Sequence, residues 1–396
     1  MTPNEKLDAM LTDFEKRTAT DPNHPGQNLR NLLNHSPDLK ARFLDSAGHD
    51  HLRRFDVLPA NAHAGGTYNP DTKSMELPQS YLDSSRTSKS ARAELVFVMG
   101  HEIQHSFNST VTADATTKFV NDVNNKATGP GPHDYTAAID TLIQTNRRDE
   151  ASANLGGFNA LASQIQKDNP KATLKDFYEA SHFRMQDFID RSGTKPHYTY
   201  TLKPDLTLDK DKNGHTVMHL SASKENVEAM GKHYFDKTLI PPNGLGPKGD
   251  QNYHNYYGEW ALNYVDAVEK SVQATHSSDP KYVAPKVEVD LQKISLDKNQ
   301  LNTTLHYTDT SAGKSSAKPV EAAPQPARGP FGDPALDKAF HAMQTGNDAQ
   351  VNLAAQQFQH STDGQRLTQA GNNLIAEHQR QEQQAQTQAP AQPQIR

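Results

Sequence analysis

Apolar residues near the start of the chain recur three and four positions apart. They form two stripes, one of Leu7, Met10, Leu11 and Phe14 and one of Leu29, Leu32 and Leu33. Because residues at this spacing share one face of a helix, the stripes predict short amphipathic helices within residues 1–54. We expect this N-terminal helical segment to pack on the domain that follows it.

A β section is predicted next. Residues 55–58 form a candidate strand, and residues 65–68 and 73–78 flank the turn sequence Asn69-Pro70-Asp71-Thr72. Two short runs separated by turn-forming residues predict a β-hairpin.

Two longer helices are predicted after this hairpin. The first begins at Ser88, which can cap it, and contains the longest apolar run of the chain, residues 95–99. A helix that is apolar nearly all round is buried. The second carries one stripe at near-helical spacing, made of Ile139, Ile143, Asn146, Glu150, Asn154, Gly157, Phe158, Leu161 and Ile165. This stripe places Glu150 on the face that packs inward.

Further along, residues 174–189 predict a helix, and a β section with a hairpin is predicted near residues 198–220. Within it, residues 209–214 copy the first half of a calcium-binding EF-hand loop, but Leu220 stands where that loop needs a bidentate Glu. The Asn213-Gly214 pair between alternating runs favours a hairpin turn over a calcium site.

The C-terminal part of the chain differs in composition. Residues 308–330 are rich in Ser, Ala, Lys and Pro, which predicts a flexible linker. Residues 331–378 predict a helical module that carries few core residues, and the Gln-rich residues 379–396 predict a disordered tail. The helical module either binds a partner or docks on the preceding domain.

Composition limits the classes of function. The chain has 396 residues, a net charge of −6 and no dense Lys/Arg cluster, which argues against nucleic acid or an anionic membrane as the main partner. The N-terminus lacks the apolar segment of a Sec signal, and no run predicts a membrane span. The absence of Cys excludes disulfides and thiolate metal sites. It is consistent with cytoplasmic synthesis, and equally with export by a specialised secretion system.

The strongest chemical signal is His101-Glu102-Ile103-Gln104-His105, an HExxH motif on the first buried helix. Residues four apart lie on one helix face about 6 Å along its axis, so both imidazoles can bind one zinc ion. Glu102 then points beside the metal, where it can take a proton from the water that the metal activates. The competing interpretation is a chance occurrence of the motif.

Glu150 is the candidate third ligand. An ionised carboxylate on an inward-facing position is costly unless a positive charge compensates it, and a metal ion does so directly. A salt bridge to Arg147 or Arg148 is the alternative.

The pattern HExxH followed by Glu-x-x-Ala-Asn resembles that of the gluzincin zinc metallopeptidases, particularly the ImmA type, over roughly residues 55–166. The resemblance implies that His101, His105 and Glu150 bind one zinc ion and that Glu102 is the catalytic base. It also implies that Asn154 holds a ligand imidazole by a hydrogen bond.

The spacing between the two parts of this pattern is long. Residues 106–149 separate His105 from Glu150, and Gly129-Pro130-Gly131-Pro132 within them suggests an inserted loop. Asp114 and His133 are the next ligand candidates if Glu150 is not one.

An α+β fold with a zincin-like core is therefore expected in residues 55–307: a small sheet or hairpin, the active-site helix and the ligand helix. By analogy with zincins, an edge strand of the hairpin would bind substrate backbone by β-addition. Zincins usually stabilise the oxyanion with a downstream Tyr or His, and Tyr256 and His254 lie in the aromatic run 253–257. Packing of a Tyr-rich helix is the alternative role of that run.

The expected function is a zinc metallopeptidase acting on proteins or peptidoglycan peptides. The order of the segments resembles that of bacterial antibacterial effectors of the type IV secretion class: an N-terminal catalytic domain, a Pro-rich linker, a helical module and a Gln-rich tail. This resemblance implies a secretion receptor and an immunity protein as partners. The alternative is a non-catalytic, zinc-stabilised binding or adaptor protein that uses the C-terminal helices.

Overall fold

The computed structural model describes residues 1–58, 65–237, 245 and 251–311. They form a mixed α+β structure in which helices predominate and the sheets are small, which confirms the fold class at this coarse level. Most of the predicted linker, the helical module and the Gln-rich tail lie outside the described residues. The linker was predicted to start too early, because Thr308–Asp309 form strand β8 and pair with β7 (Val287–Val289).

Three helices open the chain: α1 (Pro3–Arg17), α2 (Pro25–His35) and α3 (Pro37–Gly48). Thr2 and Glu5 form a capping box that satisfies backbone N–H groups at the start of α1. The two apolar stripes expected from the sequence are buried, and they belong to the same core as the apolar run of residues 95–99. This segment therefore supports the helix that carries the HExxH motif.

A three-stranded sheet follows, made of β1 (Arg54–Leu58), β2 (Thr67–Asn69) and β3 (Ser74–Pro78) in the order β1-β3-β2. Strands β2 and β3 are antiparallel and form the predicted hairpin, while β1 pairs with β3 in parallel. Strand β2 is an edge strand of this sheet. The short helix α4 (Gln79–Ser84) leads from the sheet to α5.

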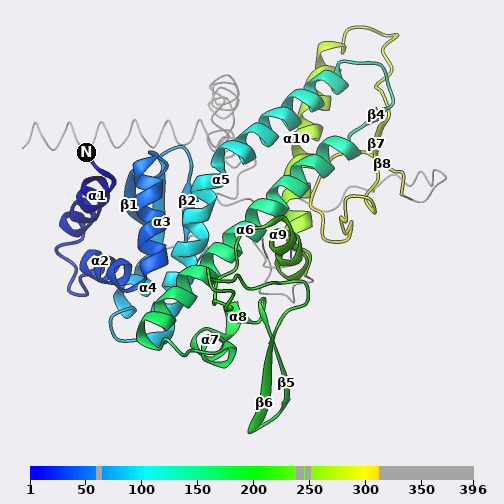
Figure 1. Ribbon diagram of the computed structural model, residues 1–396. Coiled ribbons are helices and arrows are strands. Elements are labelled where there is room, and N and C mark those ends of the chain that lie inside the picture. The colour runs from blue at the N-terminus through cyan, green and yellow to red at the C-terminus, as the bar shows by residue number, and fades with distance from the viewer. Residues whose placement is uncertain (59–64, 238–244, 246–250, 312–396) are drawn as a thin grey trace, which may run out of the picture. The chain divides into compact units, whose positions relative to one another are not determined.

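Two long helices, α5 (Lys89–Ala127) and α6 (Thr136–Asp168), pack against each other (Figure 1). Ser88 caps α5 by accepting a hydrogen bond from the Ala91 N–H group. Residues early in α5 contact residues late in α6, so the pair forms an antiparallel helical hairpin. The prediction of an inserted loop was wrong, since α5 continues to Ala127 and α6 begins at Thr136, so that only residues 128–135 connect the two helices.

Apolar side chains explain why the helices continue so far. Phe119, Val120 and Val123 on α5 and Ile139, Leu142 and Ile143 on α6 belong to a second buried core. Helix α10 (Tyr253–Thr275) completes this core with Ala261, Leu262 and Val265. Strand β4 (His133–Asp134) joins the turn to β7 in a second small sheet. The hairpin is thus a packed unit that positions residue 150 against residues 101 and 105.

The backbones of α5 and α6 approach each other closely at two glycines. A Cβ atom added to Gly100 would lie 2.6 Å from Ala160 Cβ and 2.7 Å from the Gly156 carbonyl oxygen. A Cβ atom added to Gly156 would lie 2.6 Å from the Gly100 carbonyl oxygen. This contact needs glycine on both helices, and it fixes the position of His101, the next residue.

Gly100→Ala is expected to destabilise the protein although alanine is the better helix former. Overpacking a core costs about 1–3 kcal/mol, against a gain of about 1 kcal/mol in helix propensity. Thermal unfolding should show a fall of a few degrees in melting temperature. Gly129→Ala is the matched control, because its Cβ would meet carbonyl oxygens at 3.4 Å, an ordinary contact. Equal melting temperatures for both variants would contradict the role of Gly100.

Residues 174–220 differ from the prediction. The expected single helix is broken into α7 (Leu174–Ala180) and α8 (His182–Met185), and Ile189 already begins a strand. That strand, β5 (Ile189–Thr194), pairs with β6 (His197–Leu202), so the hairpin lies earlier than expected and projects beside α7 and α8 (Figure 1). The break occurs at Ser181, whose backbone (φ −146°, ψ 76°) is not helical and lies between the end of α7 and the start of α8.

The loop after β6 contains the predicted Asn-Gly turn. A single bridge joins Lys210 to Thr216, and Gly214 has the positive φ of 84° that such a turn requires. The side chains of Asp209 and Asp211 accept hydrogen bonds from nearby residues, including the rings of His219 and His215. The turn interpretation fits these contacts better than a calcium site.

The remaining elements are α9 (Lys224–Met230) and the π-helical turn η1 (Gly231–Phe235), which pack against α6. Among the described residues, no helix combines the length and apolar character needed to span a bilayer.

Candidate metal centre

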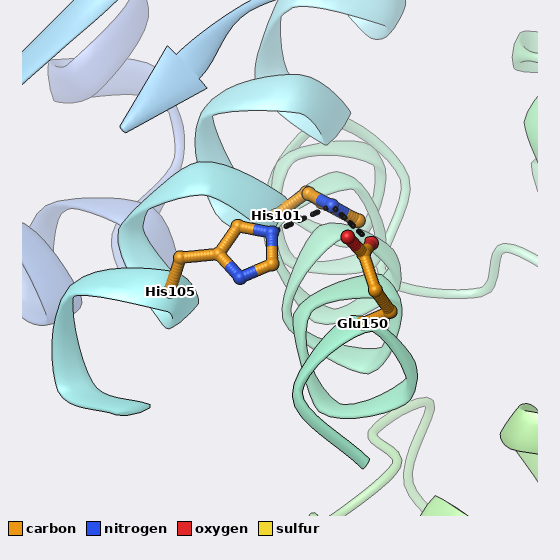
Figure 2. Close-up of side chains that lie close together, drawn as sticks. All are labelled: His101, His105 and Glu150. Carbon is orange, nitrogen blue, oxygen red and sulfur yellow. Dashed lines mark hydrogen bonds and ion pairs between the residues drawn. The ribbon is translucent and has the colours of Figure 1, made fainter. Parts of the chain in front are cut away.

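Two histidines and one glutamate converge between α5 and α6. His101 and His105 lie one turn apart on α5, and Glu150 reaches them from α6 (Figure 2). The possible ligand atoms of the three residues lie within 4.8 Å of one another, and the group is largely shielded from solvent. The structure therefore brings together the three residues that the sequence selected, and this group could bind a metal ion.

The distances within the group suit a single ion. The two Nε2 atoms of His101 and His105 are 3.1 Å apart, and His101 Nε2 lies 3.5 Å from Glu150 Oε2. Two ligands about 2.05 Å from a tetrahedral ion are separated by about 3.3 Å. A His, His, Glu donor set is also the set found in catalytic zinc sites with an open fourth position. Both separations are close to this value, so the group could hold a metal ion.

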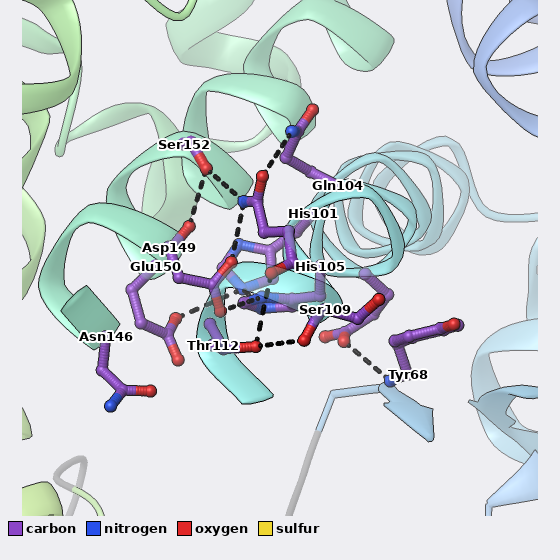
Figure 3. Close-up of polar contacts among 12 residues, drawn as sticks. Tyr68, His101, Gln104, His105, Ser109, Thr112, Asn146, Asp149, Glu150 and Ser152 are labelled. Carbon is purple, nitrogen blue, oxygen red and sulfur yellow. Dashed lines mark hydrogen bonds and ion pairs between the residues drawn. The ribbon is translucent and has the colours of Figure 1, made fainter. Parts of the chain in front are cut away.

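Asp149 orients His105. Its Oδ2 atom lies 3.0 Å from His105 Nδ1, on the side of the ring away from His101 (Figure 3). Burial opposes the charge of the imidazolium, but the neighbouring carboxylates, Asp149 above all, raise the pKa of His105 to about 10. Asp149 thus holds Nδ1 of the ring, which leaves Nε2, 3.1 Å from His101 Nε2, as the atom that could bind a metal ion.

Glu150 stays ionised although it is buried. Burial favours its neutral form, but the hydrogen bond from His101, the charges of both histidines and the Tyr257 hydroxyl together lower its pKa. The Tyr257 hydroxyl donates to Glu150 Oε1 at 2.8 Å. The alternative salt bridge is not formed among the described residues, because Arg147 pairs with Glu228 and Asp236 and the side chain of Arg148 is exposed.

Glu102 directly follows His101 on α5 and does not belong to the group that could hold a metal ion. Its Oε2 atom accepts a hydrogen bond of 3.0 Å from the backbone N–H of Tyr68 on the edge strand β2. Burial raises the pKa of Glu102, and the charges of His101 and His105 only partly offset this effect. A carboxylate whose pKa is raised towards neutrality is better suited to accept and return a proton.

Asn154 is fully buried on α6, one turn after Glu150. Its amide nitrogen contacts the Met230 sulfur at 3.2 Å, and its Oδ1 atom has no hydrogen-bond partner among the described residues. The Nδ1 atom of His101 is equally buried and unpartnered. The predicted bond from Asn154 to a ligand imidazole is thus not formed, although an acceptor and a ring nitrogen of the right kind are both left without partners.

His254 is directed to a different group. Its Nε2 atom lies 2.9 Å from Asp236 Oδ1, and its ring packs edge-on against Phe235. Burial opposes ionisation of Asp236, but hydrogen bonds from His254 and Arg147 lower its pKa to about 2. His254 thus belongs to an ion-pair network beside the candidate metal centre, and its hydrogen bond is not with a candidate ligand.

Four tyrosines surround Glu150 closely enough for its charge to raise their pKa values, in addition to the effect of burial. The Tyr234 and Tyr253 hydroxyls bond to each other, and the Tyr257 hydroxyl bonds to Glu150. The Tyr256 hydroxyl forms no hydrogen bond to a described residue, and this side chain is 41% exposed. Tyr256 is therefore the member of the group with a hydroxyl available to a ligand.

The two alternative ligand candidates, Asp114 and His133, lie away from this group. Asp114 is exposed on α5. His133 is fully buried in β4, where its Nδ1 atom lies 2.7 Å from Glu269 Oε1. Neither belongs to the group that could hold a metal ion.

Sequence reasoning missed Asp149 and Tyr257. Asp149 directly precedes Glu150, and a carboxylate at that position was a usable signal.

Comparison of the chain with protein-family models, curated proteins and solved structures finds no match.

Proposed function

We propose that this protein is a zinc-dependent hydrolase that cleaves amide bonds in proteins or peptides. The observation that carries the proposal is the convergence of His101, His105 and Glu150, with the carboxylate of Glu102 beside them. Zinc, when bound, supplies a Lewis acid that acidifies water and polarises a carbonyl group. The fourth position of a tetrahedral ion would be open to water or substrate.

Glu102 is the proposed base. One of its oxygens is held by the Tyr68 N–H group, so the other oxygen is left to accept a proton from water and return it to the leaving amine. Because the hydrogen bond comes from the backbone of β2, the edge strand and the base are held in a fixed relation. A substrate strand added to β2 would then lie alongside Glu102.

Tyr256 is the proposed donor to the developing oxyanion. Partial desolvation of its hydroxyl and the charge of Glu150 raise its pKa, so its hydroxyl stays protonated at neutral pH. A protonated hydroxyl without an internal partner can donate to a substrate oxygen as negative charge develops. Tyr257 is less suited to this role because its hydroxyl is already bound to Glu150.

Protein purified without a chelator is expected to contain about one zinc ion per chain, since the ligand set needs only small adjustments to bind it. Elemental analysis measures this directly. His105→Ala should lose most of the zinc, whereas His49→Ala, on the exposed end of α3, should retain it. Less than about half a zinc ion per wild-type chain would count heavily against the proposal.

Substrate class is tested by incubating the zinc-loaded protein with denatured proteins, a peptide library and peptidoglycan peptide stems. Cleavage that a chelator abolishes and added zinc restores would support the hydrolase. A zinc-stabilised binding protein would keep the metal and cleave none of these substrates.

A further inference from the structure

Asn108 joins α5 to α6 next to His105. Its amide nitrogen donates to Asp149 Oδ1 at 2.8 Å and to Ser152 Oγ at 2.7 Å. The Ser152 hydroxyl in turn donates to the Asp149 carbonyl oxygen at 2.9 Å. Both N–H groups of the Asn108 amide therefore point to α6, to a residue that precedes Glu150 and a residue that follows it.

The orientation of the Asn108 amide is itself fixed from the N-terminal helices. Its oxygen accepts a hydrogen bond of 3.4 Å from Gln104 Nε2, and the Gln104 oxygen accepts one of 2.8 Å from Arg42 on α3. Arg42 is anchored by Asp38 one turn earlier. With its oxygen directed to Gln104, the Asn108 amide must present its nitrogen to Asp149.

We propose that Asn108 is a positioning residue of the metal centre, which holds Asp149 so that His105 keeps its proton on Nδ1 and presents Nε2 to the metal ion. The inference rests on the proposed function for the identity of that ion. In addition, a series of hydrogen bonds from Arg42 through Gln104 and Asn108 to Asp149 connects the N-terminal helices to His105, a proposed metal ligand.

The physical reason lies in the two oxygens of Asp149. A carboxylate bound at a single oxygen can rotate about its terminal torsion, which is broad and has no strong minimum. Asn108 holds Oδ1 and leaves Oδ2 facing His105 Nδ1 at 3.0 Å. Partners of this kind, bound behind a ligand histidine, fix its tautomer and ring orientation and typically change metal affinity 10–100-fold.

The test replaces Asn108 with Leu, which has a similar shape and no hydrogen-bonding group. Zinc affinity is measured by competition with a chelating dye, and the His105 ring N–H is observed by nitrogen-15 NMR in metal-free protein. We expect Asn108→Leu to weaken zinc binding by ~10–100-fold and to lose or broaden the hydrogen-bonded Nδ1–H signal. Asn124→Leu is the matched control on the same helix, because Asn124 bonds Val120 and Tyr264 far from the metal centre.

A charge exchange separates positioning from simple packing. Asn108→Asp alone places two carboxylates together, and Asp149→Asn alone sets two amide groups against each other, so each should weaken zinc binding. In the double variant, the new amide at position 149 can donate to the new carboxylate at position 108 and accept from His105. Affinity should therefore recover relative to the sum of the single effects. Melting temperatures of all variants identify any that fail to fold.

The inference is overturned if Asn108→Leu folds, binds zinc as tightly as wild type and keeps the Nδ1–H signal. It is also overturned if the double variant shows only the sum of the two single losses. A wild-type protein that bound no zinc would defeat the proposed function, and the Nδ1–H signal would still decide the role of Asn108.

Discussion

Replacing Glu102 with Gln is expected to reduce amide hydrolysis by at least ~10²-fold, the usual scale for losing a general base. Gln has the same shape, and its side-chain oxygen can still accept the hydrogen bond from the Tyr68 N–H group. It cannot accept a proton from water at neutral pH. Turnover of a cleaved peptide by wild type and variant, at equal zinc content, measures the effect.

Zinc content and melting temperature should change little in this variant, because Glu102 does not belong to the ligand group. Glu179→Gln on α7 is a matched control, since that side chain is 54% exposed and forms only a surface pair with Lys175. Unchanged turnover in Glu102→Gln would remove this residue from the mechanism. Loss of zinc would instead indicate that the variant disturbs the fold of the site.

The sequence predicted the two helices of the site because their apolar positions repeat at helical spacing. The HExxH motif follows an apolar run. Glu150 lies on a stripe of residues most of which are buried. The motif on a buried helix and the stripe on the second helix therefore placed the three candidate ligands on inward faces. That they meet depends on the antiparallel crossing at Gly100 and Gly156, which follows from contacts between helices and not from either pattern.

Contacts between elements also explain what was missed. Tyr256 and Tyr257 are neighbours in the chain, but on a helix they point about 100° apart, so a Tyr-rich run does not tell which one faces Glu150. Asn154 was predicted to bond a ligand imidazole because it follows Glu150 by one helical turn. Asp149 contacts His105 only because α5 packs against the face of α6 that carries Asp149. The loop suggested by Gly129-Pro130-Gly131-Pro132 was overestimated because the apolar stripes beside it continue both helices.

Glu150 is expected to be the variant site with the largest effect on metal binding. Glu150→Ala removes one of three protein ligands and the negative charge that balances two histidines, so zinc should be released to a mild chelator. Glu150→Gln keeps the shape and the hydrogen bond from Tyr257 but removes the charge, so its affinity should fall between those of wild type and Glu150→Ala. Dye competition at neutral pH measures all three affinities.

Asn154→Ala sets the scale for this comparison. Asn154 is fully buried one turn from Glu150 but bonds to no member of the ligand group, so its loss should weaken zinc binding by no more than the ~10–100-fold usual for a residue behind the ligands. A third ligand must matter more than that, because without it two histidines alone would hold the ion. If Glu150→Ala retained as much zinc as wild type, the role would pass to another residue, and neither the exposed Asp114 nor His133, paired with Glu269, is placed to take it.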